Sequence, residues 1–581
     1  MKRLMLGNEA IAWGAYEAGV TVASSYPGTP STEITEHLAG CDEIYSEWSP
    51  NEKVSMEVVI GASIAGARAI TAMKHVGLNV AADPLFTVSY TGINGGLVIV
   101  VADDPGMHSS QNEQDSRHYA RAAKVPMLEP ADSQECKDFI KMAFEISENF
   151  DTPVLIRLST RVSHSLSSVE LAEREDYKLK GYKKDFVKYV MMPAMARKRH
   201  LIVEKRMRDL KEFGENTELN RIEWENRSIG VISSGIAYQY AREAFPEASF
   251  LKLGMIYPLP EKMIADFAAG VDKLFVVEEL EPFFEEQIKA MGIEVIGKER
   301  LPVTGELNVS IIREKLLGEK QSIDLPFEEK TPMRPPVMCP GCPHRATFHV
   351  LSKLKLTVTG DIGCYTLGAL PPLEAVDTCI CMGASIGMAH GMEKARGAEF
   401  RKKTVAVIGD STFIHSGITG LIDVVYNKGN SMVIILDNSI TGMTGHQDNP
   451  TTGFTIKGEP TVQVDLVKLC EAVGIRRVKV VDPFKLKEFE RTVKEEIEAD
   501  EPSVIIARRP CALLKKASYG GTVTIDSDLC INCKLCTAIA CPAILDKGDH
   551  IEIDESLCNG CLLCVEKCPR NAIVKAGVEN E

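Results

Sequence analysis

Long apolar segments are absent from the sequence. A membrane-spanning helix needs about eighteen consecutive apolar residues, and no run in this sequence approaches that length. The opening stretch MKRLMLGNEAIAWGAYEAG is interrupted by glycine and glutamate, whereas the apolar core of a secretory signal is unbroken. We therefore expect a cytoplasmic protein with no membrane partner.

Positive charge is scarce and cysteine is not. The chain has 66 lysines and arginines against 81 aspartates and glutamates, which gives a formal net charge of -15. Such a charge repels nucleic acid, so nucleic acid is not an expected partner, although a local basic patch can still attract a small anion. Most of the 17 cysteines stand in CxxC pairs or beside glycine and proline, a pattern that favours metal ligation over disulfides.

Apolar strand-like runs alternate with small-residue helical segments along most of the chain. This alternation predicts the α/β class, with several doubly wound parallel-sheet domains. A charged stretch, a proline-rich stretch and the terminal cysteines mark the boundaries between the parts. The predicted parts are an α/β domain (1–185), a helical linker (186–227), a second α/β domain (228–320), a third (330–515) and a small α+β module (520–581).

The terminal module contains two similar cysteine runs, CINCKLCTAIACP and CNGCLLCVEKCP. The second has the spacing of a bacterial ferredoxin half, in which the fourth cysteine binds the cluster of the other half. The first has one extra residue before its last cysteine, which crosswise sharing tolerates. Two structural zinc sites are the alternative, but the duplication and the Cys-Pro endings favour two [4Fe–4S] clusters. The expected ligands are Cys530, Cys533, Cys536 and Cys568 for the first cluster, and Cys558, Cys561, Cys564 and Cys541 for the second.

Polar residues follow two predicted strands of the third domain. Asp410 ends the run TVAVIG and Asn438 follows SMVIIL, so both lie at carboxyl ends of strands, where doubly wound sheets bind ligands. A carboxylate, an amide oxygen and the backbone carbonyl of Ile440 form an oxygen set suited to Mg²⁺ beside a diphosphate. The span is similar to the GDG-to-NN motif of thiamine diphosphate enzymes, with Ser411 and Asp437 as departures from it.

Several motifs together resemble one family. These are SYPGTPSTEI, GASIAGARA, CPGCPH, GDIGC, the span from Asp410 to Asn438 and the ferredoxin module. They resemble the 2-oxoacid:ferredoxin oxidoreductases, and their order is similar to that of the alpha subunits in the indolepyruvate branch. The resemblance implies a pyrimidine-binding domain (1–185), a transketolase C-terminal-like domain (228–320), a thiamine diphosphate-binding domain (330–515) and a two-cluster ferredoxin domain (520–581).

The resemblance also implies roles for individual residues. Glu52 aligns with the glutamate that hydrogen-bonds N1′ of the cofactor's aminopyrimidine, although the residues alone do not separate it from Glu57. Thr29 aligns with the threonine that holds the substrate carboxylate, in a loop where Gly28 replaces the usual isoleucine. His344 of CPGCPH falls among the cofactor-binding residues.

Cysteines in three further segments are candidates for a third cluster. Longer members of the family hold a cluster beside the thiamine with cysteines at such positions. The alternative is that CPGCPH only shapes a tight loop and that the other cysteines are buried small hydrophobes. Cys379 or Cys381 is an alternative last ligand. The expected set is Cys339, Cys342, Cys364 and Cys511.

The implied reaction is oxidative decarboxylation of an aryl 2-oxoacid such as indolepyruvate with coenzyme A, using thiamine diphosphate and Mg²⁺. Electrons pass through the clusters to an external ferredoxin. None of the parts reads as the family's further α/β domain, so we expect a smaller beta subunit in an α2β2 assembly. The alternatives are a non-oxidative thiamine-dependent decarboxylase and an electron-transfer subunit with inactive thiamine domains.

Overall fold

The computed structural model describes residues 1–319, 335–514 and 519–576. The chain forms two compact units, Met1–Glu328 and Glu329–Glu581, and each is described by itself. Among the described residues, no helix combines the length and the apolar character needed to cross a membrane.

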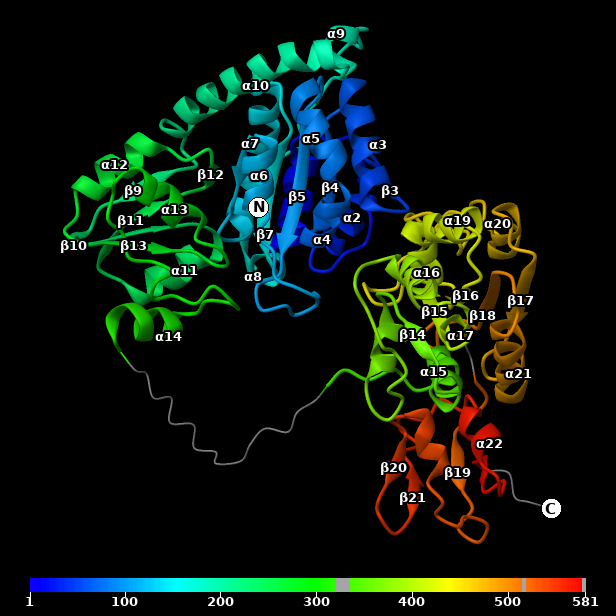
Figure 1. The fold of residues 1–581 in the computed structure, drawn as a ribbon. Coiled ribbons are helices and arrows are strands. Elements are labelled where there is room, and N and C mark those ends of the chain that lie inside the picture. The colour runs from blue at the N-terminus through cyan, green and yellow to red at the C-terminus, as the bar shows by residue number, and fades with distance from the viewer. Residues whose placement is uncertain (320–334, 515–518, 577–581) are drawn as a thin grey trace. The chain divides into compact units, whose positions relative to one another are not determined.

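The first unit is built on a seven-stranded sheet with strand order β12-β6-β7-β5-β4-β2-β3 (Figure 1). Its strands are parallel except β12, which pairs antiparallel with β6. Alternate residues of the central strand enter different cores: Val98 and Val100 face one, Ile99 and Val101 the other. The strands are β2 (Val22–Ser25), β3 (Tyr45–Trp48), β4 (Ala69–Lys74), β5 (Leu97–Asp103), β6 (Met127–Leu128), β7 (Val154–Ser159) and β12 (Met255–Tyr257).

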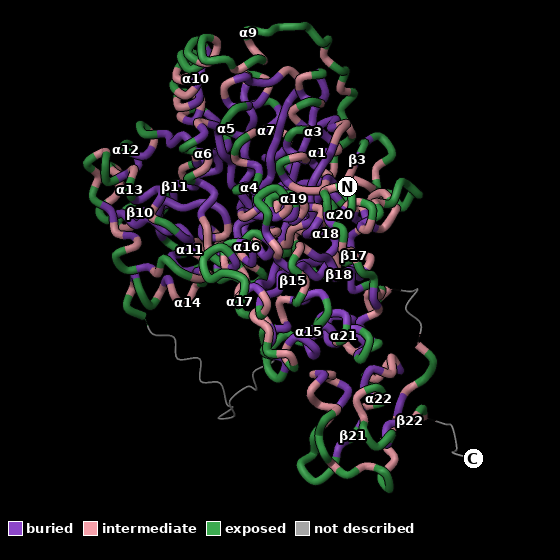
Figure 2. Tube along the Cα trace, turned by 45° about the vertical axis from the view of Figure 1, so that its right-hand side comes forward, coloured by how far each residue is buried: buried purple, intermediate pink, exposed green. Residues whose placement is uncertain are grey.

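Helices cover both faces of this sheet, as a sheet buried on two sides requires. One core contains residues of α1 (Gly7–Glu17), α2 (Thr32–Ala39) and α7 (Ser133–Phe150). The other contains residues of α3 (Glu52–Ile64), α4 (His75–Val80), α5 (Ala82–Thr91) and α6 (Arg117–Ala123). Figure 2 shows the strands between these helices as buried. The short α8 (Thr160–His164) leads to an antiparallel pair formed by β1 (Lys2–Leu6) and β8 (Leu166–Glu170).

A four-stranded sheet with order β13-β10-β11-β9 completes the first unit. The predicted linker range contains two helices and also β9, which pairs antiparallel with β11. The elements from there onward are α9 (Phe186–Tyr189), α10 (Pro193–Gly214), β9 (Arg221–Glu223), β10 (Asn226–Ser233), α11 (Gly235–Ala244), β11 (Ala248–Lys252), α12 (Glu261–Ala269), β13 (Leu274–Val277), α13 (Phe283–Ala290) and α14 (Val309–Ile312).

The second unit is built on a five-stranded parallel sheet with order β14-β15-β16-β18-β17. The strands are β14 (Thr357–Thr359), β15 (Thr404–Gly409), β16 (Met432–Asp437), β17 (Arg477–Val481) and β18 (Ser503–Arg508). The central strands are completely buried runs such as TVAVIG and MVIILD, which is typical of a parallel sheet covered on both faces. The helices are α15 (Pro343–Lys353), α16 (Ala384–Arg396), α17 (Ala398–Arg401), α18 (Asp410–Thr412), α19 (Ile418–Tyr426), α20 (Leu466–Ala472) and α21 (Leu486–Ile497).

The cysteine module closes the second unit with two antiparallel strand pairs. They are β19 (Val523–Ile525) with β22 (Ile573–Lys575), and β20 (Ile544–Asp546) with β21 (Ile551–Ile553). A 3₁₀ helix, η4 (Leu535–Ile539), and the short helix α22 (Leu563–Lys567) connect them. Ile539 and Ile544 of the module share one hydrophobic core with Phe348 of α15. The module is therefore packed on the parallel-sheet domain of its unit. The predicted fold class is confirmed.

Candidate active site

Asp410 is buried where β15 ends and α18 begins. Its side chain accepts two backbone hydrogen bonds, from the N–H of Ser411 to Oδ1 (2.7 Å) and from the N–H of Ser439 to Oδ2 (3.0 Å). Burial raises the pKa of Asp410 to about 7, and the neighbouring carboxylate of Asp437 raises it further. A buried acid beside a second acid is a place where a divalent cation relieves both desolvation and repulsion.

Asn438 and Ile440 follow the adjacent strand β16. Both residues are buried, and Oδ1 of Asn438 accepts a hydrogen bond from the N–H of Ile440 (3.3 Å). The predicted carboxylate, amide and carbonyl oxygens thus come from neighbouring strand ends of one sheet, and hard oxygens of this kind suit Mg²⁺. Within the three described ranges no three His, Cys, Asp or Glu side chains converge on one metal ion; the predicted Mg²⁺ set has a single acid, Asp410.

Four cysteines from three segments lie close to this strand end. The N–H of Cys511 donates to the backbone carbonyl of Asn438 (2.9 Å). Burial raises the pKa of the Cys364 thiol, and the nearby thiols of Cys511 and Cys339 raise it further. Burial also raises the pKa of Cys342 to about 12, with Cys339 and Cys364 acting in the same direction. The four residues of the predicted third set are therefore neighbours, although their thiols do not converge on one metal position within the described residues.

The alternative ligands Cys379 and Cys381 belong to another loop. Sγ of Cys379 donates to the backbone carbonyl of Asp361 (3.7 Å). Burial raises the pKa values of both Cys379 and Cys381, and Asp361 is the largest charged contributor for each. Their surroundings favour Cys511 as the fourth member of the set.

His344 lies in the first turn of α15, directly after the CPGC loop. It is buried, and its ring meets the ring of Tyr365 nearly edge-on at 5.8 Å between centroids. Burial lowers the pKa of His344 to about 4, so the imidazole is neutral at physiological pH. It can exchange a hydrogen bond with a bound group but does not supply positive charge.

Two cavities in the terminal module are lined by the predicted cluster ligands. The lining of one includes Cys530, Cys533, Cys536 and Cys568. The lining of the other includes Cys541, Cys558, Cys561 and Cys564. In each cavity the fourth cysteine comes from the other half of the module, as the ferredoxin spacing predicts. The two pockets have the ligand chemistry that iron–sulfur clusters require.

In the first unit, Glu52 is the first residue of α3. Asn51 caps the helix, because its side chain accepts a hydrogen bond from the N–H of Val54 (2.9 Å). The Glu52 carboxylate lies against Gly77 of α4, where a Cβ atom would stand only 2.8 Å from Oε1. Glu52 is buried, whereas the side chain of Glu57 is half-exposed and pairs with Lys53. The local geometry favours Glu52 as the cofactor-facing residue.

Thr29 lies in the loop between β2 and α2, beside the end of β4. Oγ of Ser109 donates to the backbone carbonyl of Thr29 (3.4 Å), and Nζ of Lys74 donates to the carbonyl (2.5 Å) and Oγ (3.1 Å) of Ser109. Lys74 is buried, which lowers its pKa to about 8. The next residue, His75, is also buried, and neither ring nitrogen has a hydrogen-bond partner among the described residues. A buried lysine is therefore connected through Ser109 to the loop of the predicted substrate-binding threonine.

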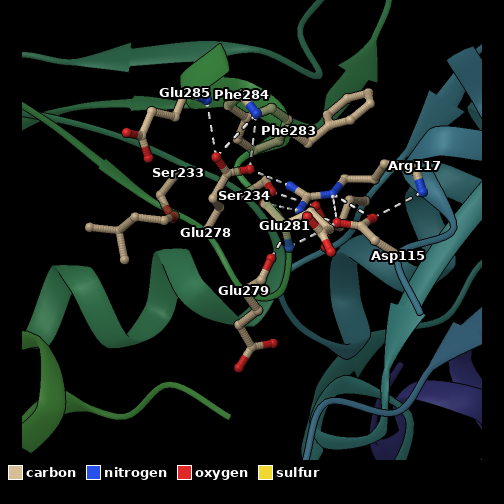
Figure 3. Close-up of polar contacts among 12 residues, drawn as sticks. Asp115, Arg117, Ser233, Ser234, Glu278, Glu279, Glu281, Phe283, Phe284 and Glu285 are labelled. Carbon is tan, nitrogen blue, oxygen red and sulfur yellow. Dashed lines mark hydrogen bonds and ion pairs between the residues drawn. The ribbon is translucent and has the colours of Figure 1, made fainter. Parts of the chain in front are cut away.

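A second buried polar cluster joins the two large sheets of the first unit (Figure 3). The Arg117 guanidinium pairs with Asp115 and with Glu278, which follows β13, and all three side chains are about 1% exposed. Glu278 also accepts hydrogen bonds from the N–H groups of Phe284 and Glu285. Because both charges of each pair are inside the protein, this cluster fixes one sheet against the other.

Comparison with known proteins decides the family. The model of the thiamine-binding region of pyruvate flavodoxin/ferredoxin oxidoreductases matches residues 13–228, the C-terminal domain of thiamine pyrophosphate enzymes matches 361–507, and the 4Fe-4S binding domain matches 551–574. The indolepyruvate oxidoreductase subunit IorA of Archaeoglobus fulgidus is 42% identical over 99% of this chain and 98% of its own length. The chain belongs to the IorA family. The predicted resemblance is confirmed.

Other IorA proteins match over similar lengths. The subunit of Pyrococcus abyssi is 42% identical over 93% of this chain and 91% of its own. That of Methanothermobacter thermautotrophicus is 39% identical over 99% and 98%. The chain is thus a member of the 2-oxoacid:ferredoxin oxidoreductases, with thiamine-binding domains and a 4Fe–4S domain.

Two basic residues near these sites are not among the residues predicted from the sequence. Lys74 ends an apolar run, and Arg345 directly follows CPGCPH. A basic residue adjoining a recognised motif is the signal that could have found both. Lone lysines and arginines are mostly solvated, so it is burial next to a recognised motif that marks these two residues in the structure.

Proposed function

We propose that this chain is the thiamine-dependent subunit of an enzyme that oxidatively decarboxylates an aryl 2-oxoacid, with indolepyruvate as its main substrate. The 2-oxoacid, coenzyme A and two oxidised ferredoxins give the aryl-acetyl-CoA, CO₂, two reduced ferredoxins and a proton. The observation that carries the proposal is that the Asp410 strand end and two cysteine-lined cavities lie in one compact unit. A non-oxidative decarboxylase has no use for those cavities.

The first unit supplies the residue that exchanges a proton with the cofactor and the residues that contact the substrate. Glu52 exchanges a hydrogen-bonded proton with the N1′ atom of thiamine diphosphate, and its burial against Gly77 supports this role. When bound, that cofactor supplies the electron sink for loss of CO₂. Thr29 donates a hydrogen bond to the substrate carboxylate. The positive charge of Lys74, which reaches the Thr29 loop through Ser109, attracts that carboxylate.

The second unit holds the diphosphate end and the electron acceptors. Asp410, Asn438 and the carbonyl of Ile440 bind Mg²⁺, and neutral His344 contributes a hydrogen bond at the cofactor site. The cysteine set around Cys339 and Cys364 holds a third [4Fe–4S] cluster next to that strand end. The two cavities of the terminal module would hold the other two clusters, which would supply the one-electron chemistry that an external ferredoxin requires.

The proposed assembly contains a second polypeptide. A smaller beta subunit supplies the α/β domain that the predicted parts of this chain lack, and two copies of each chain form the enzyme. The IorA relatives are themselves named as subunits, which supports a partner chain. The protein acts in the cytoplasm, where free coenzyme A and ferredoxin are available.

Turnover measurements on the assembled enzyme test this function. The chain is purified without oxygen together with its beta subunit, and ferredoxin reduction is compared on indolepyruvate, phenylpyruvate and pyruvate, with and without coenzyme A. We expect aryl substrates to be preferred and a CoA thioester to form. Glu52→Gln should retain thiamine diphosphate and iron but lose about 10²-fold or more of the rate. Aldehyde release without ferredoxin reduction contradicts the proposal, and so does full activity of this chain alone.

A further inference from the structure

Arg345 is a buried cation at the junction between α15 and the ferredoxin module. The residue is 1% exposed, and its Nε donates to the backbone carbonyl of Cys339 (3.0 Å). Nη1 donates to the carbonyls of Ile539 and Ala540, immediately before Cys541. Nη2 is buried and has no hydrogen-bond partner among the described residues. One guanidinium thus holds the CPGC loop against the turn that leads to a predicted cluster ligand.

The same guanidinium lines a cluster cavity. The cavity of Cys541, Cys558, Cys561 and Cys564 is also lined by Pro340, Gly341 and Arg345. A second contact fixes this junction, because Nδ2 of Asn559 donates to the carbonyl of Pro340 (2.9 Å). Gly341 lies against Asn559 so closely that a Cβ atom would stand 2.2 Å from its amide nitrogen. The CPGC loop, to which Arg345 donates, is therefore close-packed against the module at this cavity.

The charge of Arg345 has no carboxylate partner within the described residues. Arg117, equally buried in the first unit, pairs with Asp115 and Glu278. An unpaired buried charge costs several kcal/mol, so such a residue is retained where another anion compensates it. Cysteines of the two flanking sets surround Arg345: burial lowers the pKa of its guanidinium, and Cys541, Cys342, Cys339 and Cys561 act against that lowering.

The other cluster cavity has no comparable group. Its cationic lining residues, Lys534 and Arg570, are exposed, so solvent and salt screen their charges. The two halves of the module are similar in sequence spacing but differ in this one feature. The asymmetry gives the two clusters different electrostatic surroundings.

We propose that Arg345 is a positioning residue that raises the reduction potential of the cluster held by Cys541, Cys558, Cys561 and Cys564. Reduction adds one electron and hence one negative charge to the cluster, and the buried guanidinium stabilises the reduced state more than the oxidised one. That cluster is then the easier of the pair to reduce, and it faces the loop that carries Cys339 and Cys342. It is the entry point for electrons into the module. The inference rests on the cluster ligands assigned under the proposed function.

Redox titration of the anaerobically purified enzyme, followed by electron paramagnetic resonance, tests the inference. In Arg345→Gln we expect the midpoint of one cluster to fall by at least about 59 mV, which is a tenfold loss in the ratio of reduced to oxidised cluster. The midpoint of its neighbour stays in place. The matched control is Lys534→Gln at the other cavity, whose exposed charge should have a smaller effect. Unchanged midpoints in Arg345→Gln overturn the proposal.

A lysine variant separates charge from hydrogen bonding. Arg345→Lys keeps the positive charge and loses the planar fork, so we expect it to retain iron and a midpoint near that of the wild type. A lysine variant that loses the cluster, or whose midpoint falls as far as in Arg345→Gln, shows that the backbone contacts matter and not the charge, and this refutes the proposal. Iron content and turnover on indolepyruvate report on the proposed function, whereas the midpoint difference reports on Arg345, so the two can fail separately.

Discussion

Glu279 provides a quantitative test of how the first unit handles buried charge. It follows Glu278 after β13, is 5% exposed, and its Oε1 accepts a hydrogen bond from the N–H of Leu307 (2.9 Å). Burial raises its pKa from 4.5 to about 7. We therefore expect Glu279→Gln, which replaces the acid with a neutral side chain of the same shape, to stabilise the protein at alkaline pH.

The sign and size follow from the pKa. A carboxyl whose pKa is higher in the folded state than in the unfolded state holds its proton in the folded state, and its favourable contribution is lost as the pH rises towards 7. The difference between a pKa of 4.5 and a pKa of about 7 corresponds to about 3 kcal/mol at pH 8 and to about 1 kcal/mol or less at pH 5. Glutamine carries no such penalty at either pH.

Calorimetry of the anaerobically purified chain at pH 5 and pH 8 measures the effect. The variant should be more stable than the wild type at pH 8 by up to about 3 kcal/mol, with the difference shrinking at pH 5. The matched control is Glu278→Gln, one residue away: burial raises the pKa of Glu278 as well, but this carboxylate pairs with Arg117, so losing the charged contact should destabilise the protein by about 1.5–3 kcal/mol at pH 8. Parallel pH profiles for the wild type and Glu279→Gln would refute the reasoning.

Three further outcomes follow from the sites. Asp410→Ala should lose Mg²⁺ and thiamine diphosphate on dialysis. Asp437→Asn should keep both, because the Asp437 carboxylate pairs with an arginine on β18, and equal cofactor content in the two variants rejects the Mg²⁺ assignment. Cys339→Ser should lower the iron content from about twelve to about eight atoms per chain, whereas the control Cys470→Ser, at a buried position in α20, should leave it unchanged. A wild-type count near eight iron atoms in active enzyme excludes the third cluster. Lys74→Met should raise the KM for the 2-oxoacid at least about tenfold, and the wild-type KM should rise above about pH 8 as Lys74 loses its proton; a KM that stays flat over that range contradicts the role.

The parallel sheets were predictable because their strands are buried on both faces and read as continuous apolar runs. Residues 97–103 and 432–437 are of this kind, and they form β5 and β16. The strand β17, Arg477–Val481, was missed because it lies at a sheet edge and is only partly buried, so charged residues interrupt its pattern. The edge strand β12 was missed for another reason: it has three residues and joins a sheet formed by an earlier segment.

Candidate ligands were predictable where spacing or a strand end defines them. The eight module cysteines are spaced as in ferredoxins, and Asp410 and Asn438 end apolar runs. The set of Cys339, Cys342, Cys364 and Cys511 has no contiguous spacing, so only the fold shows that its members are neighbours. The choice between Glu52 and Glu57 likewise needed the structure, since both stand on one helix and only burial and the recess at Gly77 separate them.

The burial of a cationic side chain indicates that anions or hydrogen-bond acceptors lie nearby, which its residue type alone does not. A guanidinium inside a protein loses its hydration, and it persists where bound anions or well-placed acceptors compensate for that loss. At Arg117 the compensation is internal, from two carboxylates. At Arg345 three backbone carbonyls take part of the donor capacity, one buried nitrogen has no partner among the described residues, and the residue lines a cavity that also contains four cysteines. Since thiolate clusters gain negative charge on reduction, the same residue that fastens the module to the CPGC loop also favours electron arrival there. Attachment and redox asymmetry thus have one physical cause, which is why the lysine and glutamine variants of Arg345 must differ.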